Sequence, residues 1–275
     1  MRYGFTLNGG DNFRQLVEFA VDAEAAGWDG FFLPDAIAIE TKQFPALPFF
    51  DPWVLLGAMA IRTERIRLGT FLTALPRRRP WKLAREVVTL DHLSQGRAIL
   101  AVGLGAAEDD GGFYKVGEEM DIRIRAQRLD EGLEILAGLW QGKPFSFTGE
   151  HYNLDQMTQL PPPVQKPRVP IWVPGVWPKP KSIDRTIRWD GIIPQAARLK
   201  PETVAQIRQY VLERRATKDP FDIIVGGSTP GAVKDRKKAA AKVRPFADAG
   251  TTWWIESLWS GDVRKRIQQG PPRLD

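Results

Sequence analysis

The chain has 275 residues, of which 43% are apolar, with a formal net charge of +6, no cysteine and two histidines. It is too apolar for a disordered protein and long enough for a (β/α)8 barrel, which needs roughly 250 residues. The lack of cysteine excludes disulfides, thiolate metal sites and a cysteine nucleophile, and two isolated histidines do not favour a zinc site.

The hydropathy and charge patterns bear on location and partners. No apolar run approaches the roughly 18 residues of a membrane span, and the first residues, MRYGFTLNGG, lack the apolar core of a signal peptide. We therefore expect a cytoplasmic protein without membrane association. Basic residues are spread over helices that are also rich in Glu and Asp, which does not favour nucleic-acid binding, and the basic excess suits an anionic small ligand.

Short apolar runs alternate with segments of helical periodicity along the chain. Near the N-terminus, for example, strand 2–7 precedes helix 11–26, which Gly27 ends, and Asp51-Pro52 begins another helix. The eight predicted strands are 2–7, 28–33, 66–72, 98–102, 169–173, 190–193, 222–225 and 251–255. The later predicted helices are 80–93, 123–140, 182–188, 201–215, 231–247 and 261–268.

One excursion interrupts this alternation. Residues 141–168 contain a possible hairpin at 145–154 and the proline cluster 161–163, so we expect an insertion between the fourth helix and the fifth strand. Eight strand–helix units predict an α/β fold, a TIM (β/α)8 barrel that occupies residues 1–275 as a single domain. A doubly wound open sheet is the alternative, but the turn after the first strand lacks the G-x-G-x-x-G spacing of a dinucleotide site.

In a barrel the site lies at the carboxyl ends of the strands, and here these ends are rich in glycine. The run IVGGSTPG places Gly226, Gly227, Ser228 and Thr229 between a strand and a helix that begins with proline. This arrangement predicts phosphate binding at a helix N-terminus, and a tight turn with a simple helix cap is the alternative.

Other strand ends leave alternatives open. Gly103 and Gly105 suit either a ligand contact or close packing, and Asp35 suits a ligand contact, a helix cap or a turn. Glu108 begins a carboxylate cluster after the fourth strand, where a glycosidase would place one of its two acids. Strand alternation predicts that one residue of the Trp253-Trp254 pair points into the barrel and the other against a helix.

At these strand ends the sequence resembles the bacterial luciferase-like oxidoreductases, which depend on flavin or deazaflavin. The resemblance covers nearly the whole chain. It rests on GWDGFFLPD (27–35), DPWVLLGAMA (51–60) with RIRLGTFLT (65–73), RPWKLAREVVTLDHLSQGR (79–97), AVGLG (101–105), RLDEGLEILAGLW (128–140), VPIWVPG (169–175) and RIQQGPPR (266–273).

The resemblance implies that FMN or the 8-hydroxy-5-deazaflavin coenzyme F420 lies over the carboxyl end of the barrel. It also implies a bulge with a non-proline cis peptide beneath the ring, within Phe71, Leu72 and Thr73. The remaining residues at positions where the family contacts ring and phosphate are Asp35, Gly103, Gly105, Gly175 and the 226–229 loop. Arg77 to Arg79 are interpreted as solvated or structural, with contact to a phosphate or acidic cofactor tail as the alternative.

The function that follows is hydride transfer or monooxygenation on a small organic substrate, in a homodimer, with a separate flavin reductase as a possible partner. Asp35 and Glu108 are the candidate catalytic acids or bases. Many deazaflavin-dependent members carry histidine after the second-strand acid, whereas Ala36 follows Asp35 here. A non-catalytic flavin-binding relative and a sugar-phosphate lyase or isomerase are the alternative functions.

Overall fold

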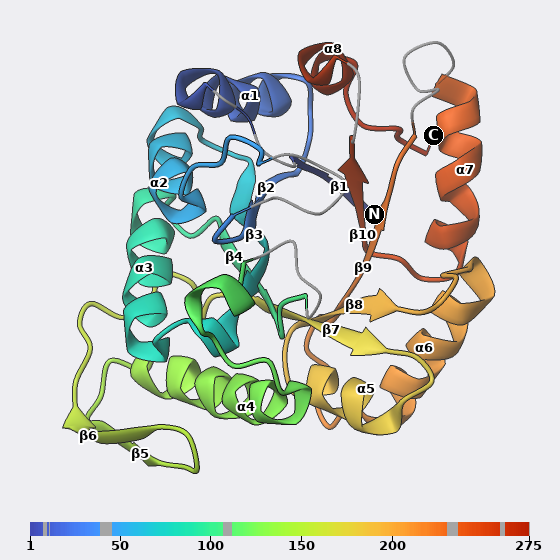
Figure 1. The fold of residues 1–275 in the computed structure, drawn as a ribbon. Coiled ribbons are helices and arrows are strands. Elements are labelled where there is room, and N and C mark those ends of the chain that lie inside the picture. The colour runs from blue at the N-terminus through green and yellow to red at the C-terminus, as the bar shows by residue number, and fades with distance from the viewer. Residues whose placement is uncertain are drawn as a thin grey trace.

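The computed structural model contains a closed barrel of eight parallel strands, with helices around it (Figure 1). It describes residues 1–7, 10, 12–38, 46–106, 112–229, 236–258 and 262–274. The strand order around the barrel is β1-β10-β9-β8-β7-β4-β3-β2, so the predicted fold class is confirmed. The barrel strands are β1 (Arg2–Thr6), β2 (Gly30–Asp35), β3 (Arg67–Ala74), β4 (Ala98–Gly103), β7 (Ile171–Val176), β8 (Gly191–Gln195), β9 (Asp222–Gly227) and β10 (Trp253–Ser257).

Helices follow the barrel strands and pack outside them. They are α1 (Phe13–Ala25), α2 (Pro52–Arg62), α3 (Pro80–Leu93), α4 (Ile122–Leu139), α5 (Pro180–Ile187), α6 (Pro201–Arg214), α7 (Arg236–Asp248) and α8 (Val263–Gln268). Short 3₁₀ turns lie at Leu75–Arg77 and Tyr114–Val116. None of these described helices is both long and apolar enough to cross a membrane.

Local sequence explains where several helices begin. The Asp51 carboxylate accepts a hydrogen bond from the Val54 amide, 3.0 Å away, and Pro52 follows at the first helical position of α2. Asp121 caps α4 in the same way. The sequence predicted that the seventh helix, α7, begins at residue 231. Residues 230–235 lie outside the described residues, and the described part of α7 begins at Arg236.

The inserted segment forms a two-stranded antiparallel hairpin, β5 (Phe145–Thr148) and β6 (Asn153–Met157), between α4 and β7. The Phe145 ring fills the space beside Gly138 of α4, where a Cβ atom would overlap it. The Glu131 carboxylate of α4 accepts the turn amide of Tyr152 at 3.0 Å. The hairpin is thus fastened to the outside of α4, away from the barrel strands.

The barrel interior is filled by a separate apolar cluster. Phe32, Trp172 and Trp253 form its aromatic centre, with ring centroids 5.6 Å apart for Phe32–Trp172 and 5.2 Å for Trp172–Trp253. Trp254 instead packs outward against Phe246 of α7, as strand alternation predicted. The remaining members are Ile99, Ala101, Ile193, Ile224 and Ile255. Because side chains fill the barrel interior, a ligand cannot enter it and must bind at the carboxyl ends of the strands.

Candidate active site

The end of β3 departs from regular strand geometry. Against β4, Thr70 pairs with Leu100 and Thr73 with Val102, so three steps along β3 match two along β4. This is a β-bulge, and the peptide bond between Phe71 and Leu72 within it is cis. Both features lie within the segment where the resemblance implied them.

The bulge presents an apolar surface at the barrel mouth. Phe71 and Leu72 are partly buried and pack on the interior cluster, with the Phe71 ring 6.2 Å from that of Phe32. Leu72 also fills the space beside Gly103, where a Cβ atom would come within 2.8 Å of a Leu72 methyl carbon. Gly103 therefore has a packing reason to be glycine, because a larger residue would displace Leu72 from the barrel interior.

Strand alternation separates the predicted residues into two faces. Ile224 lies in the interior cluster, so Gly226, two residues later on β9, shares that inward face. A Cβ atom on Gly226 would meet no atom within 4 Å, whereas one on Gly227 would overlap the Trp254 indole. A Cβ atom on Gly175 would lie 2.9 Å from Ile183 of α5, on the outer side. Of these three glycines, Gly226 borders open space.

Asp35 points away from the barrel interior, between β2, β3 and α2. One carboxylate oxygen accepts hydrogen bonds from the Thr73 hydroxyl at 2.7 Å and the Trp53 indole N–H at 3.4 Å. The other accepts from Arg77 and Arg78, each at 2.6 Å. The Asp35 side chain is fully buried, with 0% exposed. A carboxylate held by four donors is suited to anchoring the chain after β3, and this geometry favours a positioning role over the predicted proton transfer.

Arg77 and Arg78 are consequently structural rather than solvated. Their side chains are 7% and 21% exposed and both pair with Asp35, while Arg79, just before α3, is exposed. The Nε atoms of Arg77 and Arg78 are buried without a hydrogen-bond partner. The bulge is therefore held by two arginines that come from the next turn of the chain.

A third arginine, which sequence reasoning missed, lies at the end of β4. Arg125 of α4 is 1% exposed and donates through Nη1 to the carbonyls of Leu104 and Gly105, each 3.2 Å away. Its Nε and Nη2 atoms are buried without a partner. Gly105 adopts a positive φ of +81° and lies against the Phe113 ring, so it too has a packing and backbone reason to be glycine.

The predicted phosphate loop is partly engaged by the protein itself. The Thr229 amide donates to Glu256 at 2.6 Å, and its hydroxyl lies 2.9 Å from both carboxylate oxygens. Glu256 is 0% exposed, accepts the Trp254 indole N–H at 3.0 Å and pairs with buried Arg266 at 3.5 Å. Burial lowers the pKa of the Arg266 guanidinium, although Glu256 favours its charged form. Thr229 is therefore engaged within the protein, and the Ser228 carbonyl accepts a hydrogen bond from Lys242 at 2.6 Å. Phosphate contact by Gly226, Gly227 and Ser228 stays a prediction.

Glu108, the second catalytic candidate, lies outside the described residues together with the rest of 107–111. Its role stays a prediction. The sequence marks Glu256 as a strand-end residue and places Trp53 and Arg266 within the motifs that carry the family resemblance, but it assigned none of the three a role. The position of Glu256 at a strand end gives no indication of a partner ten residues later.

The fold and the barrel mouth together define a (β/α)8 barrel protein with an apolar surface, formed by Phe71 and Leu72, at the carboxyl ends of its strands. We call this surface the Phe71–Leu72 platform. The sequence matches the family model of the luciferase-like monooxygenases over residues 3–270. The chain therefore belongs to that family, which confirms the resemblance found in the sequence.

Two curated relatives show the range of activities among similar proteins. An F420-dependent glucose-6-phosphate dehydrogenase of Microbacterium testaceum is 34% identical over 178 residues, covering 63% of this chain and 50% of that protein. An N-acetyl-S-(2-succino)cysteine monooxygenase of Bacillus subtilis is 33% identical over 156 residues, covering 54% and 35%. The matches span between 35% and 64% of the length of the curated relatives.

Among solved structures, an F420-dependent secondary alcohol dehydrogenase in complex with an F420-acetone adduct superposes with a TM-score of 0.81. The match covers 97% of this chain and 96% of that one at 19% sequence identity. At this identity the match shows a shared fold.

Proposed function

We propose that this chain is an oxidoreductase that binds FMN or the deazaflavin F420 at its barrel mouth and acts on a small organic substrate. The observation that carries the proposal is the pairing of the Phe71–Leu72 platform with the open inward face of Gly226. An apolar surface over a packed interior, with backbone exposed beside it, suits a flat ring with a phosphate. The family membership supports the same cofactor class.

The residues present fit such a cofactor. Phe71 and Leu72 would support the ring, and the backbone of Gly226, Gly227 and Ser228 would contact its phosphate. The cofactor supplies the redox chemistry, either hydride transfer or, as reduced FMN, oxygen activation, while the protein supplies orientation and water exclusion. We propose residues 1–275 as one functional domain.

A side-by-side titration with FMN, reduced FMN and F420 tests the proposal. We expect saturable binding of at least one of the three, and the one preferred identifies the cofactor. Absence of saturable binding for all three below about millimolar contradicts the proposal.

A matched pair of glycine variants on β9 locates the site. Gly226→Leu adds a side chain where the protein leaves space, so we expect unchanged thermal stability and at least about tenfold weaker cofactor binding. Gly227→Ala directs a methyl group into Trp254, so we expect lower stability. Undiminished cofactor affinity in Gly226→Leu would contradict cofactor binding beside Gly226.

One observation favours the non-catalytic alternative. Asp35, the catalytic candidate that the structure describes, is sealed from solvent and held by four donors. A flavin-binding protein without turnover needs no exposed acid or base at the mouth. Cofactor reoxidation that depends on an added substrate rules this alternative out, whereas tight binding without any turnover supports it.

We also propose a cytoplasmic homodimer, served by a separate flavin reductase if FMN is the cofactor. Support for the dimer comes from a groove of about 640 Å³ between α1 and α2, bordered by apolar side chains such as Val54 and Ile61, which are 75% and 69% exposed. Replacing both Val54 and Ile61 by Glu is expected to give a monomer by light scattering. A dimer that persists in this variant contradicts an interface at α1 and α2.

A further inference from the structure

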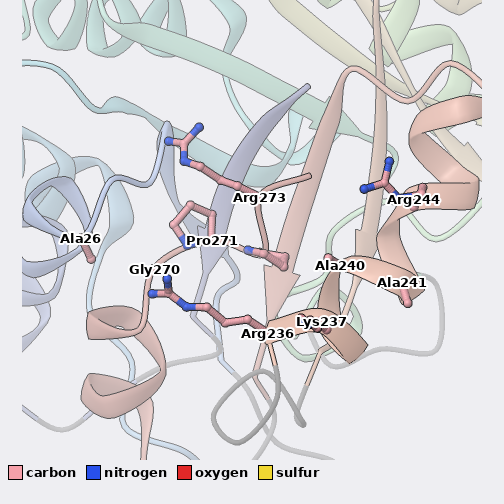
Figure 2. A pocket seen from close by; sticks show the side chains of 10 residues that line it. Ala26, Arg236, Lys237, Ala240, Ala241, Arg244, Gly270, Pro271 and Arg273 are labelled. Carbon is pink, nitrogen blue, oxygen red and sulfur yellow. The ribbon is translucent and has the colours of Figure 1, made fainter. Parts of the chain in front are cut away.

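A second cavity lies outside the candidate cofactor site, between α7 and the segment that follows α8 (Figure 2). We call it the C-terminal groove, and its volume is about 460 Å³. None of the predicted cofactor residues lines it. Its lining residues are Ala26, Arg236, Lys237, Ala240, Ala241, Arg244, Gly270, Pro271, Pro272 and Arg273.

The groove carries a concentrated positive charge. Four of its lining side chains are cationic, and none of the described lining residues is acidic. Helix α7 itself, RKKAAAKVRPFAD, has five basic residues and one acidic residue. Figure 2 shows Arg236, Arg244 and Arg273 around the groove, two from α7 and one from the C-terminal segment. A cavity lined by several cations favours the binding of an anion.

The spacing along α7 leaves room between the charges. Arg236 and Lys237 lie one helical turn before Ala240 and Ala241, and Arg244 lies one turn after them. One face of the helix thus has cations at both ends and two small side chains in the middle. A ligand can therefore approach the helix backbone closely while its charges meet cations on either side.

Backbone carbonyls position two of the arginines. Arg236 Nη2 donates to the Gln269 carbonyl and Arg273 Nη2 to the Gly27 carbonyl, each at 2.6 Å. The Asp29 carboxylate lies 3.9 Å from Arg273, with side chains that are 31% and 53% exposed, so this ion pair offsets part of the Arg273 charge. Backbone carbonyls orient a guanidinium while leaving its full charge and its other N–H groups for a ligand.

The wall opposite α7 is rigid. Gly270 has a φ of +74°, and a Cβ atom there would lie 2.7 Å from the Ala26 carbonyl oxygen, so the chain turns close against the end of α1. Pro271 and Pro272 follow and restrict the backbone. Arg273 is therefore carried on a stiff segment, which lowers the entropy cost of ordering the site around a ligand.

We propose that the C-terminal groove binds a small, multiply charged phosphate-type anion, such as a pyrophosphate or a phosphate ester. Arginine forks match phosphate geometry, and four cations favour a ligand with more than one negative charge. The cavity has the size of a small-molecule site and no aromatic side chain lines it within the described residues, so it lacks the stacking surfaces of a single-stranded nucleic-acid site. This site is independent of the proposed redox function.

Calorimetric titration with inorganic pyrophosphate at constant ionic strength, with sulfate as the comparison anion, tests the proposal on the full chain. We expect saturable one-to-one binding of pyrophosphate in the submillimolar range, and weaker binding of sulfate. The double variant Lys237→Gln/Arg244→Gln and the single variant Ala241→Glu are each expected to weaken pyrophosphate binding at least about tenfold.

The control is Lys143→Gln/Lys181→Gln, which removes two exposed lysines on the hairpin side and on α5, outside the groove. It lowers the net charge equally and is expected to leave binding unchanged. Ala241→Glu adds a charge on an exposed helix position, so it tests the groove even if the Arg244 variant does not fold.

Three results overturn the proposal: no saturable binding by the unaltered chain, equal weakening in the control, or binding of single-stranded RNA without pyrophosphate. Titration of the same variants with FMN and F420 separates this site from the barrel mouth.

Discussion

Arg97, just before β4, and Arg125, in the first turn of α4, lie at opposite ends of the same strand. Arg97 uses all its side-chain nitrogens, donating to the carbonyls of Ala60, Thr63, Ile66 and Ser94 and to the Thr63 hydroxyl, at 2.7–3.0 Å. Arg125 donates to two carbonyls and leaves Nε and Nη2 buried without a partner. The comparison shows that every side-chain nitrogen of Arg97 is satisfied at the amino end of β4, whereas two nitrogens of Arg125 at the carboxyl end are not.

The largest expected effect on stability comes from removing the Asp35 carboxylate, which pairs with Arg77 and Arg78 at the carboxyl end of the barrel. Asp35→Asn leaves two guanidiniums, those of Arg77 and Arg78, without their buried counter-charge, so we expect a loss of about 3–5 kcal/mol in the free energy of unfolding. Denaturant unfolding measures it, with the exposed Asp155→Asn as the control. A loss equal to that of the control would mean that Asp35 does not hold the bulge.

Replacing Arg97 and Arg125 by methionine, one at a time, tests whether the two ends of β4 differ in what their arginines do. Arg97→Met removes five hydrogen bonds to groups that stay buried, and we expect it to lower the free energy of unfolding by about 3 kcal/mol without weakening cofactor binding. Arg125→Met removes two long bonds and is expected to cost about 1 kcal/mol. Because these bonds hold the backbone at Leu104 and Gly105, beside the proposed cofactor site, we also expect weaker cofactor binding. Similar stability losses and equal cofactor affinities in the two variants would remove the distinction between the ends.

The smallest expected effect on stability concerns the Glu24 carboxylate, at the amino end of the barrel. Burial opposes ionisation of Glu24, but the backbone N–H groups of Ile66, Arg65 and Glu64 outweigh it and lower its pKa below the ordinary 4.5. A lowered folded-state pKa contributes stability above about pH 4.5 that is lost as the pH falls through the folded value.

We therefore expect Glu24→Gln to reduce the free energy of unfolding by about 1 kcal/mol at pH 7 and to flatten its decline in acid. Unfolding measured between pH 7 and pH 3 checks this, with the exposed Asp155→Asn as the comparison. A decline of the same steepness in Glu24→Gln and the unaltered chain would show that Glu24 does not contribute it.

Much of the fold followed from periodicity, because alternation of apolar runs and helical faces depends on neighbouring residues. The predicted third strand ended at Leu72, two residues short of the observed Ala74, because the bulge at Thr70 to Thr73 breaks the regular pattern that the prediction used. The opposite orientations of Trp253 and Trp254 were predictable, since strand alternation is a local property.

The site was less predictable. The sequence identified the residues at the strand ends but not which of them face the barrel interior. In the structure Gly226 faces inward beside open space, whereas Gly175 and Gly227 face outward and pack against other side chains. The partners of Asp35 lie 42 and 43 residues away, and Arg125 approaches Gly105 from another helix. No pattern in a single sequence encodes such pairings.

By itself the sequence determined the strand and helix order, the barrel class, the family and the region of β3 at the mouth, because these depend on local propensity and on motifs read in order. Only the tertiary structure decided that Asp35 anchors Arg77 and Arg78, that Thr229 is engaged with Glu256, and that four cations meet in the C-terminal groove. The physical reason is that barrel closure brings together charges far apart in the chain, and the partners they find there decide which remain available to a ligand.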